Sequence, residues 1–182
     1  MNLNLISKSI QEGVSMEKIN LYDRNGNPTD IVIDRKDKSY PLTENEFIPT
    51  SIIYIENSKG EFLMQQTSLN KGGKYSSTGG HVDSGETPLL AIIRETKEEI
   101  GVDVTKEELK YLGYIVDGKV LRFIYYIKKD VDINVVIVQK EEVSDVLYMS
   151  VDKIKELHNK KQMLESHYKV FEKVLEYLEE NK

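Results

Sequence analysis

One segment, residues 80–102, constrains the fold more than any other because it marks both ends of a helix and gives that helix two different faces. Thr87 is a favourable N-cap, Pro88 stands at the first helical position, and Gly101 stands where a left-handed residue ends a helix. The spacing therefore predicts a helix over residues 88–100. At 100° per residue, one face of this helix is suited to a core and the opposite face is acidic. The core face holds Leu89, Ile92, Ile93, Thr96 and Ile100, and the acidic face holds Glu95, Glu98 and Glu99.

The acidic face predicts a bound cation. Like charges three or four residues apart destabilise a helix by roughly 0.2–0.5 kcal/mol per pair, so three glutamates on one face need compensation. A hard divalent cation provides it, and oxygen ligands suit Mg²⁺ or Mn²⁺. For a glutamate triplet alone, a solvated acidic surface would be the simpler interpretation.

The full segment reads GHVDSGETPLLAIIRETKEEIGV from Gly80, and it resembles the Nudix box. The family pattern has an aliphatic residue after Arg-Glu, where this chain has Thr96; the other defined positions match. We expect the Thr96 hydroxyl to bond back to the Ile92 carbonyl. The resemblance implies an α/β protein with the Nudix fold, in which a mixed β-sheet packs between helices as an α/β/α sandwich.

The resemblance also implies roles for residues of the box. The Gly80 carbonyl, Glu95, Glu98 and Glu99 are the expected metal ligands, with Glu95 serving either as a ligand or as the general base. Glu95 and Glu98 are therefore catalytic candidates.

Three further residues have supporting or open roles. Glu86 and Arg94 are expected to pair and to fix the loop against the helix, and His81 either contacts a phosphate or closes the loop. Some family members take their base from a loop outside the box. Residues 139–144 resemble such a segment, which makes Glu142 a third catalytic candidate, although a solvated turn is the alternative.

The rest of the chain predicts a single α/β domain over residues 16–182. Strands are expected at residues 49–56, 61–67, 111–116, 119–128 and 145–149, with hairpin turns at residues 57–60 and 117–118. Thr105 and Glu108 form a capping box that predicts a short helix. Ser150 is the expected cap of a helix over residues 151–157, and an apolar stripe of Leu164, Tyr168, Phe171, Leu175 and Leu178 predicts a C-terminal helix. Residues 1–15 are a polar extension, either disordered or a mis-assigned start that precedes Met16.

Composition excludes several classes of function. The chain has no cysteine, so thiolate catalysis and thiolate metal sites are impossible. A net charge of -6 argues against nucleic-acid binding, and no run of 18 apolar residues predicts a membrane span. We expect a cytoplasmic protein that acts on a small phosphorylated molecule, with a homodimer left open.

The predicted activity is that of a Mg²⁺-dependent pyrophosphohydrolase cleaving a diphosphate linkage in a nucleoside diphosphate derivative. Segments NLYDRNGNPTDIVIDR, GGHVDSGE and QKEEVSDVLYMS resemble Nudix hydrolases related in sequence to type 1 isopentenyl-diphosphate isomerase. That isomerase needs a catalytic cysteine, which argues against the isomerase reaction here. The alternatives are a nucleotide-binding sensor without catalysis and an isomerase-like protein. A nucleobase could stack on Tyr75, Tyr125 or Tyr126, although core packing is the commoner role of such residues.

Overall fold

The computed structural model describes residues 17–181, so the polar extension and the proposed start at Met16 lie outside the described residues. A small sheet of β1 (Lys18–Tyr22) and β2 (Pro28–Asp34) precedes the main sheet. The main sheet comprises β3 (Ile48–Glu56), β4 (Phe62–Thr67), β5 (Tyr75–Ser76), β6 (Thr78–His81), β7 (Lys110–Asp117), β8 (Val120–Lys128) and β9 (Val143–Met149). The helices are α1 (Pro88–Ile100), α2 (Val151–Asn159) and α3 (Glu165–Glu180), with a 3-10 turn η1 (Leu69–Lys71).

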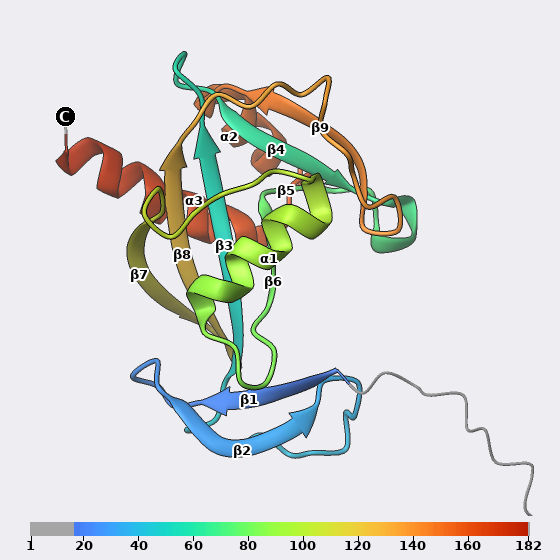
Figure 1. Cartoon of the computed structure of the whole chain (residues 1–182), viewed down its shortest axis with the longest axis vertical. Coiled ribbons are helices and arrows are strands. Elements are labelled where there is room, and N and C mark those ends of the chain that lie inside the picture. Colours follow the sequence, from blue (N-terminus) through green and yellow to red (C-terminus); the bar gives the residue numbers. More distant parts are fainter. Residues whose placement is uncertain (1–16, 182) are drawn as a thin grey trace, which may run out of the picture.

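The main sheet is mixed, as predicted. Its strands run in the order β5-β4-β3-β8-β7, with β6 also paired to β3 and β9 to β4. The β3 and β8 strands are parallel, and the other pairs are antiparallel. Figure 1 shows α1 in front of β3 and β8 and α3 behind them. The expected α/β/α arrangement is therefore confirmed.

Two apolar cores, one on each face of the sheet, hold the helices in place. Alternate residues of β3 point to opposite faces, so Ile53 belongs to the core that contains Ile92 of α1, and Tyr54 belongs to the core that contains Phe171 of α3. All four side chains are at most 1% exposed. Full burial of a large apolar side chain contributes roughly 1.5–3 kcal/mol, so these contacts fix both helices on the sheet.

The sheet opens beside β3, and this opening positions the site. After their hairpin, β3 and β4 pair only between Glu56 and Phe62. Lower down, β6 takes the place next to β3, with Thr78–His81 paired to Thr50–Ile53. A Cβ atom at Gly79 would lie 2.4 Å from the Ser51 carbonyl oxygen, so this close approach requires glycine.

Helix α1 has the predicted ends. The Thr87 hydroxyl accepts a hydrogen bond from the Leu90 N–H at 3.3 Å, and Gly101 has a φ of 66°. The Thr96 hydroxyl donates to the Ile92 carbonyl at 2.6 Å, also as predicted, and Thr96 is fully buried.

Most of the other elements also match their predictions, including the helix capped by Ser150. The stripe on α3 is confirmed for Tyr168, Phe171, Leu175 and Leu178, whereas Leu164 precedes the helix and lies outside that core. The short helix expected at Thr105 to Glu108 is wrong. The Glu108 carboxylate does accept from the Thr105 N–H at 2.8 Å, but residues 106–108 form only a turn. So short a segment cannot offset the cost of helix nucleation, and the chain instead pairs Lys110 with Tyr126 at the start of β7.

None of the helices within residues 17–181 is long and apolar enough to cross a membrane.

Candidate active site

A cleft of about 520 Å³ lies beside β6 and brings together most of the predicted site residues. Its lining includes seven of the residues singled out from the sequence, namely Gly80, His81, Arg94, Glu95, Glu98, Glu99 and Glu142. The eighth, Glu86, reaches the site only through Arg94. Residues from β6 and α1 therefore meet the segment before β9 in one cleft, although that segment is far from the other two in the sequence.

Glu99 is the most deeply placed of the three helix glutamates, with 8% of the residue exposed. One carboxylate oxygen accepts from the Gly79 backbone N–H at 3.2 Å and from the Gln65 amide at 3.1 Å. Burial, together with the nearby charge of Glu95, raises the pKa of Glu99 to about 7. The fold thus holds the Glu99 carboxyl group in a place that favours its protonated form.

Glu95 packs against the backbone of Gly80. A Cβ atom at Gly80 would lie 2.1 Å from Glu95 Oε1, so any side chain here would displace this carboxylate from its position. Burial also raises the pKa of Glu95, although hydrogen bonds from Arg94 oppose that effect. Glu98 is more accessible, with 53% of its side chain exposed.

Arg94 links the loop to the helix, as predicted. Its Nε and Nη2 donate to the two Glu86 oxygens at 3.1 and 2.9 Å, and Nη2 also donates to the His81 carbonyl at 3.1 Å. Its Nη1 donates to Glu95 at 2.8 Å and to Glu98 at 3.1 Å. The hydrogen bonds to Glu86 raise the pKa of Arg94, so its positive charge always lies between these carboxylates.

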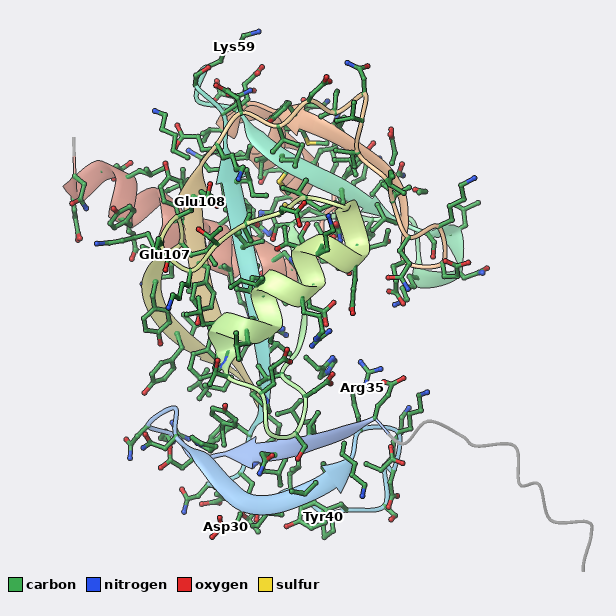
Figure 2. The ribbon with its side chains drawn as sticks, in the orientation of Figure 1. Asp30, Arg35, Tyr40, Lys59, Glu107 and Glu108 are labelled. Carbon is green, nitrogen blue, oxygen red and sulfur yellow. The ribbon has the colours of Figure 1, made fainter. Side chains whose placement is uncertain are left out.

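Two basic residues form the rim of the cleft beside the predicted candidates. Arg35, on the segment after β2, points from the small sheet toward the main sheet (Figure 2) and contacts His81 Nδ1 at 2.9 Å. Burial and then the charge of Arg35 lower the pKa of His81 to about 4, so this imidazole is neutral at pH 7. Glu142 forms an ion pair with Lys71 of η1 and faces the same cleft.

The donor atoms of this site suit a hard divalent cation. Within residues 17–181, no three Asp, Glu or His side chains converge closely enough to surround an ion. Glu95, Glu98 and Glu99 nevertheless offer carboxylate oxygens along one wall, and the space beside Gly80 is kept free of a side chain. Buried carboxylates with raised pKa values gain most from a nearby cation, so the residues fit Mg²⁺ or Mn²⁺.

Several residues that line the cleft were not predicted from the sequence to be site residues. They are Gln65, Thr67, Ser77, Arg122 and His167. Among the described residues, the buried Thr67 hydroxyl lacks a hydrogen-bond partner, which suits it to a water molecule or a ligand. Of the tyrosines considered for base stacking, Tyr125 and Tyr126 are buried in the two cores, one in each.

Comparison with known proteins gives a consistent family assignment. The family model described as NUDIX domain matches residues 47–174. An uncharacterized Nudix hydrolase, lin0387, from Listeria innocua is 31% identical over 59% of this chain and 66% of its own length. The mouse bis(5'-nucleosyl)-tetraphosphatase [asymmetrical] is 29% identical over 60% of this chain and 77% of its own length.

A solved structure supports the fold independently. Protein DR0079 from Deinococcus radiodurans superposes with a TM-score of 0.70 at 18% identity, covering 86% of this chain and 98% of the other. The expected relation to isopentenyl-diphosphate isomerase is not supported by these comparisons. With a family match over most of the described residues and with the box glutamates gathered in one cleft, the chain belongs to the Nudix hydrolase family.

Proposed function

We propose that this protein hydrolyses a diphosphate linkage in a nucleoside diphosphate derivative, with Mg²⁺ or Mn²⁺ held by Glu95, Glu98, Glu99 and the Gly80 carbonyl. The observation that carries the proposal is the placement of the three glutamates along one wall of the cleft, beside the backbone of β6. A wall of carboxylates repels a phosphorylated substrate unless a cation lies between them.

A divalent cation bound at this wall would neutralise phosphate charge and lower the pKa of a bound water molecule. Side chains of the protein would orient the carboxylates and bind the substrate. Arg94 orients Glu95 and Glu98 through Nη1 and ties them to the loop through Glu86. On the rim, Arg35 contacts His81 and forms an ion pair with Glu17, and it is placed to bind an incoming phosphate in exchange for that pair.

A general base must accept the proton of the attacking water. Glu95 is one candidate because it lies beside Gly80 in the wall that faces the substrate. Glu142 is the other, because it faces the cleft from a separate loop, where Lys71 holds it. A carboxylate contributes roughly 10²- to 10⁴-fold in such a role, so kinetics of variants separate the two.

The proposed substrate class draws on the relatives as well as on the site. The mouse relative is named for action on bis(5'-nucleosyl) tetraphosphates, in which two nucleosides are joined through four phosphates linked by phosphoanhydride bonds. All three box glutamates are present and lie in the cleft, which favours catalysis over binding alone.

The test is phosphate release from a panel of nucleoside diphosphate derivatives and nucleoside polyphosphates, with Mg²⁺ and with EDTA. We expect hydrolysis of at least one member in Mg²⁺ only, and its loss in Glu98→Gln. The matched control is Glu107→Gln, which neutralises an exposed glutamate away from the cleft (Figure 2) and should leave the rate unchanged. Substrate binding without turnover across the panel would overturn the proposal in favour of a sensor.

A further inference from the structure

Arg122 lines the cleft but has no role in the hydrolysis proposed above. It lies on β8 opposite Thr50 of β3, and Thr50 in turn lies opposite His81 of β6. Neighbouring strands are about 4.8 Å apart, so the three residues form a row across the sheet. Arg122 Nη1 reaches back to 3.5 Å from the Thr50 hydroxyl. Its guanidinium therefore lies over β3, between β8 and β6, and it lines the same cleft as the three box glutamates.

The surroundings of Arg122 leave an excess of positive charge. Its Nε and Nη2 both donate to one Asp117 oxygen at 3.2 Å, and Lys169 donates to the other Asp117 oxygen at 2.7 Å. Two cations thus share a single carboxylate. Only 14% of the Arg122 side chain is exposed, so its charge is poorly screened by solvent and acts on a ligand in the cleft.

His167 of α3 adds a second donor on the same wall. Its Nδ1 lies 3.0 Å from the Ser77 hydroxyl, and its backbone carbonyl accepts from the Tyr54 hydroxyl at 2.7 Å. Burial and then the charge of Arg122 lower the pKa of His167 to about 3, so the imidazole is neutral. The neutral tautomer in which Nδ1 accepts from the Ser77 hydroxyl carries its proton on Nε2. Within residues 17–181, Nε2 has no hydrogen-bond partner, and the residue lines the cleft.

We propose that Arg122 and His167 bind an additional phosphate of the substrate, next to the diphosphate linkage that water attacks beside the three glutamates, so that the preferred substrates carry at least three linked phosphates. This inference rests on the proposed function. A guanidinium and an imidazole N–H are both donors, and phosphate oxygens are acceptors only. Ile52 and Leu164 also line this cleft, and apolar side chains near an ionic contact strengthen it by limiting water.

The first test measures binding alone, by calorimetry in Mg²⁺ with methylene-bridged analogues of triphosphate and diphosphate, which keep the phosphate charges but cannot be hydrolysed. We expect wild type to bind the triphosphate analogue about 10- to 100-fold more tightly than the diphosphate analogue, which is the range for a charge-assisted hydrogen bond. Arg122→Met should abolish this difference, and His167→Ala should reduce it about 2- to 10-fold.

Asp117→Asn is the matched control, because it breaks the same ion pair and leaves Arg122 in place. It should retain the preference for triphosphate. The inference is overturned if wild type shows no preference, if Arg122→Met retains it, or if Asp117→Asn loses it as Arg122→Met does. Melting curves of each variant, with Arg122→Lys as a charge-retaining substitute, separate a binding defect from a folding defect.

The second test is kinetic. Arg122→Met should lower kcat/KM for a nucleoside triphosphate about 10- to 100-fold, mainly through KM, and should change it less than about threefold for a substrate with two phosphates. An equal loss for both substrates would overturn the inference. If no member of the panel is hydrolysed, the proposed function fails, yet the calorimetric result still decides whether the phosphate subsite exists.

Discussion

Replacing Glu99 by glutamine should make the metal-free protein more stable at pH 8, because the fold keeps this carboxylate in an unfavourable place. Glu99 is 8% exposed, and its pKa is raised from 4.5 to about 7. At 1.36 kcal/mol per pKa unit, ionising it in the folded protein costs roughly 3 kcal/mol above pH 7. A carboxyl with a raised pKa favours folding below about pH 4.5, and that contribution is lost as the pH rises through about 7.

The glutamine side chain removes the ionisation cost and retains part of the hydrogen bonding. Its carbonyl oxygen can still accept from the Gly79 N–H, whereas the bond from Gln65 is weakened, at a cost of about 1 kcal/mol. The net gain for Glu99→Gln at pH 8 is therefore about 2 kcal/mol, or roughly 4–8 °C in Tm. At pH 5 the gain should almost disappear, because wild-type Glu99 is protonated there.

Urea unfolding of wild type and Glu99→Gln in EDTA, at pH 5 and pH 8, measures this difference directly. Glu98→Gln is the control, because the Glu98 side chain is 53% exposed and should give no such gain. The reasoning is refuted if Glu99→Gln is no more stable than wild type at pH 8, or if its gain is the same at both pH values.

Three shorter predictions concern activity. Glu98→Gln should lose most hydrolysis, because an amide is a far poorer Mg²⁺ ligand than a carboxylate. Its free energy of unfolding should stay within about 0.5 kcal/mol of the wild-type value. Near-normal turnover would show that catalysis does not depend on Glu98. Gly80→Ala should lower kcat more than about tenfold and should weaken the rise in Tm caused by Mg²⁺. The reason is that its Cβ would lie 2.1 Å from Glu95 Oε1 and would displace that carboxylate. An unchanged rise in Tm with Mg²⁺ would contradict this prediction. If Glu142 is the base, Glu142→Gln should lower kcat about 10²-fold or more and alter its pH profile, whereas unchanged values would leave Glu142 as a surface ion-pair partner of Lys71.

Local signals in the sequence predicted the elements that position the glutamates. Thr87, Pro88 and Gly101 determine the ends of α1 through backbone chemistry that acts within a few residues, so the helix and its acidic face could be predicted. The capping box at Thr105 misled because its hydrogen bond forms without a helix. Pairing between β7 and β8 decided the conformation there, and such pairing is not a local property.

The wall with Arg122 and His167 could not be predicted in the same way. The two residues come from β8 and α3, and only the parallel β3–β8 pairing and the docking of α3 bring them to one cleft. One signal was present, because Arg122 interrupts the apolar strand VLRFIYYI on the side that carries Ile124 and Tyr126. A charged residue on a buried strand face indicates either an ion pair or a ligand site, and the structure shows it paired with Asp117 and lining the cleft.

The most direct test of the central claim is hydrolysis in H₂¹⁸O with Mg²⁺, followed by mass spectrometry of both products. Attack of water on phosphorus predicts one ¹⁸O atom in a phosphate group of a single product, with no turnover in EDTA and little in Glu98→Gln. Label in a product outside its phosphate groups, or undiminished turnover in EDTA, would contradict the account.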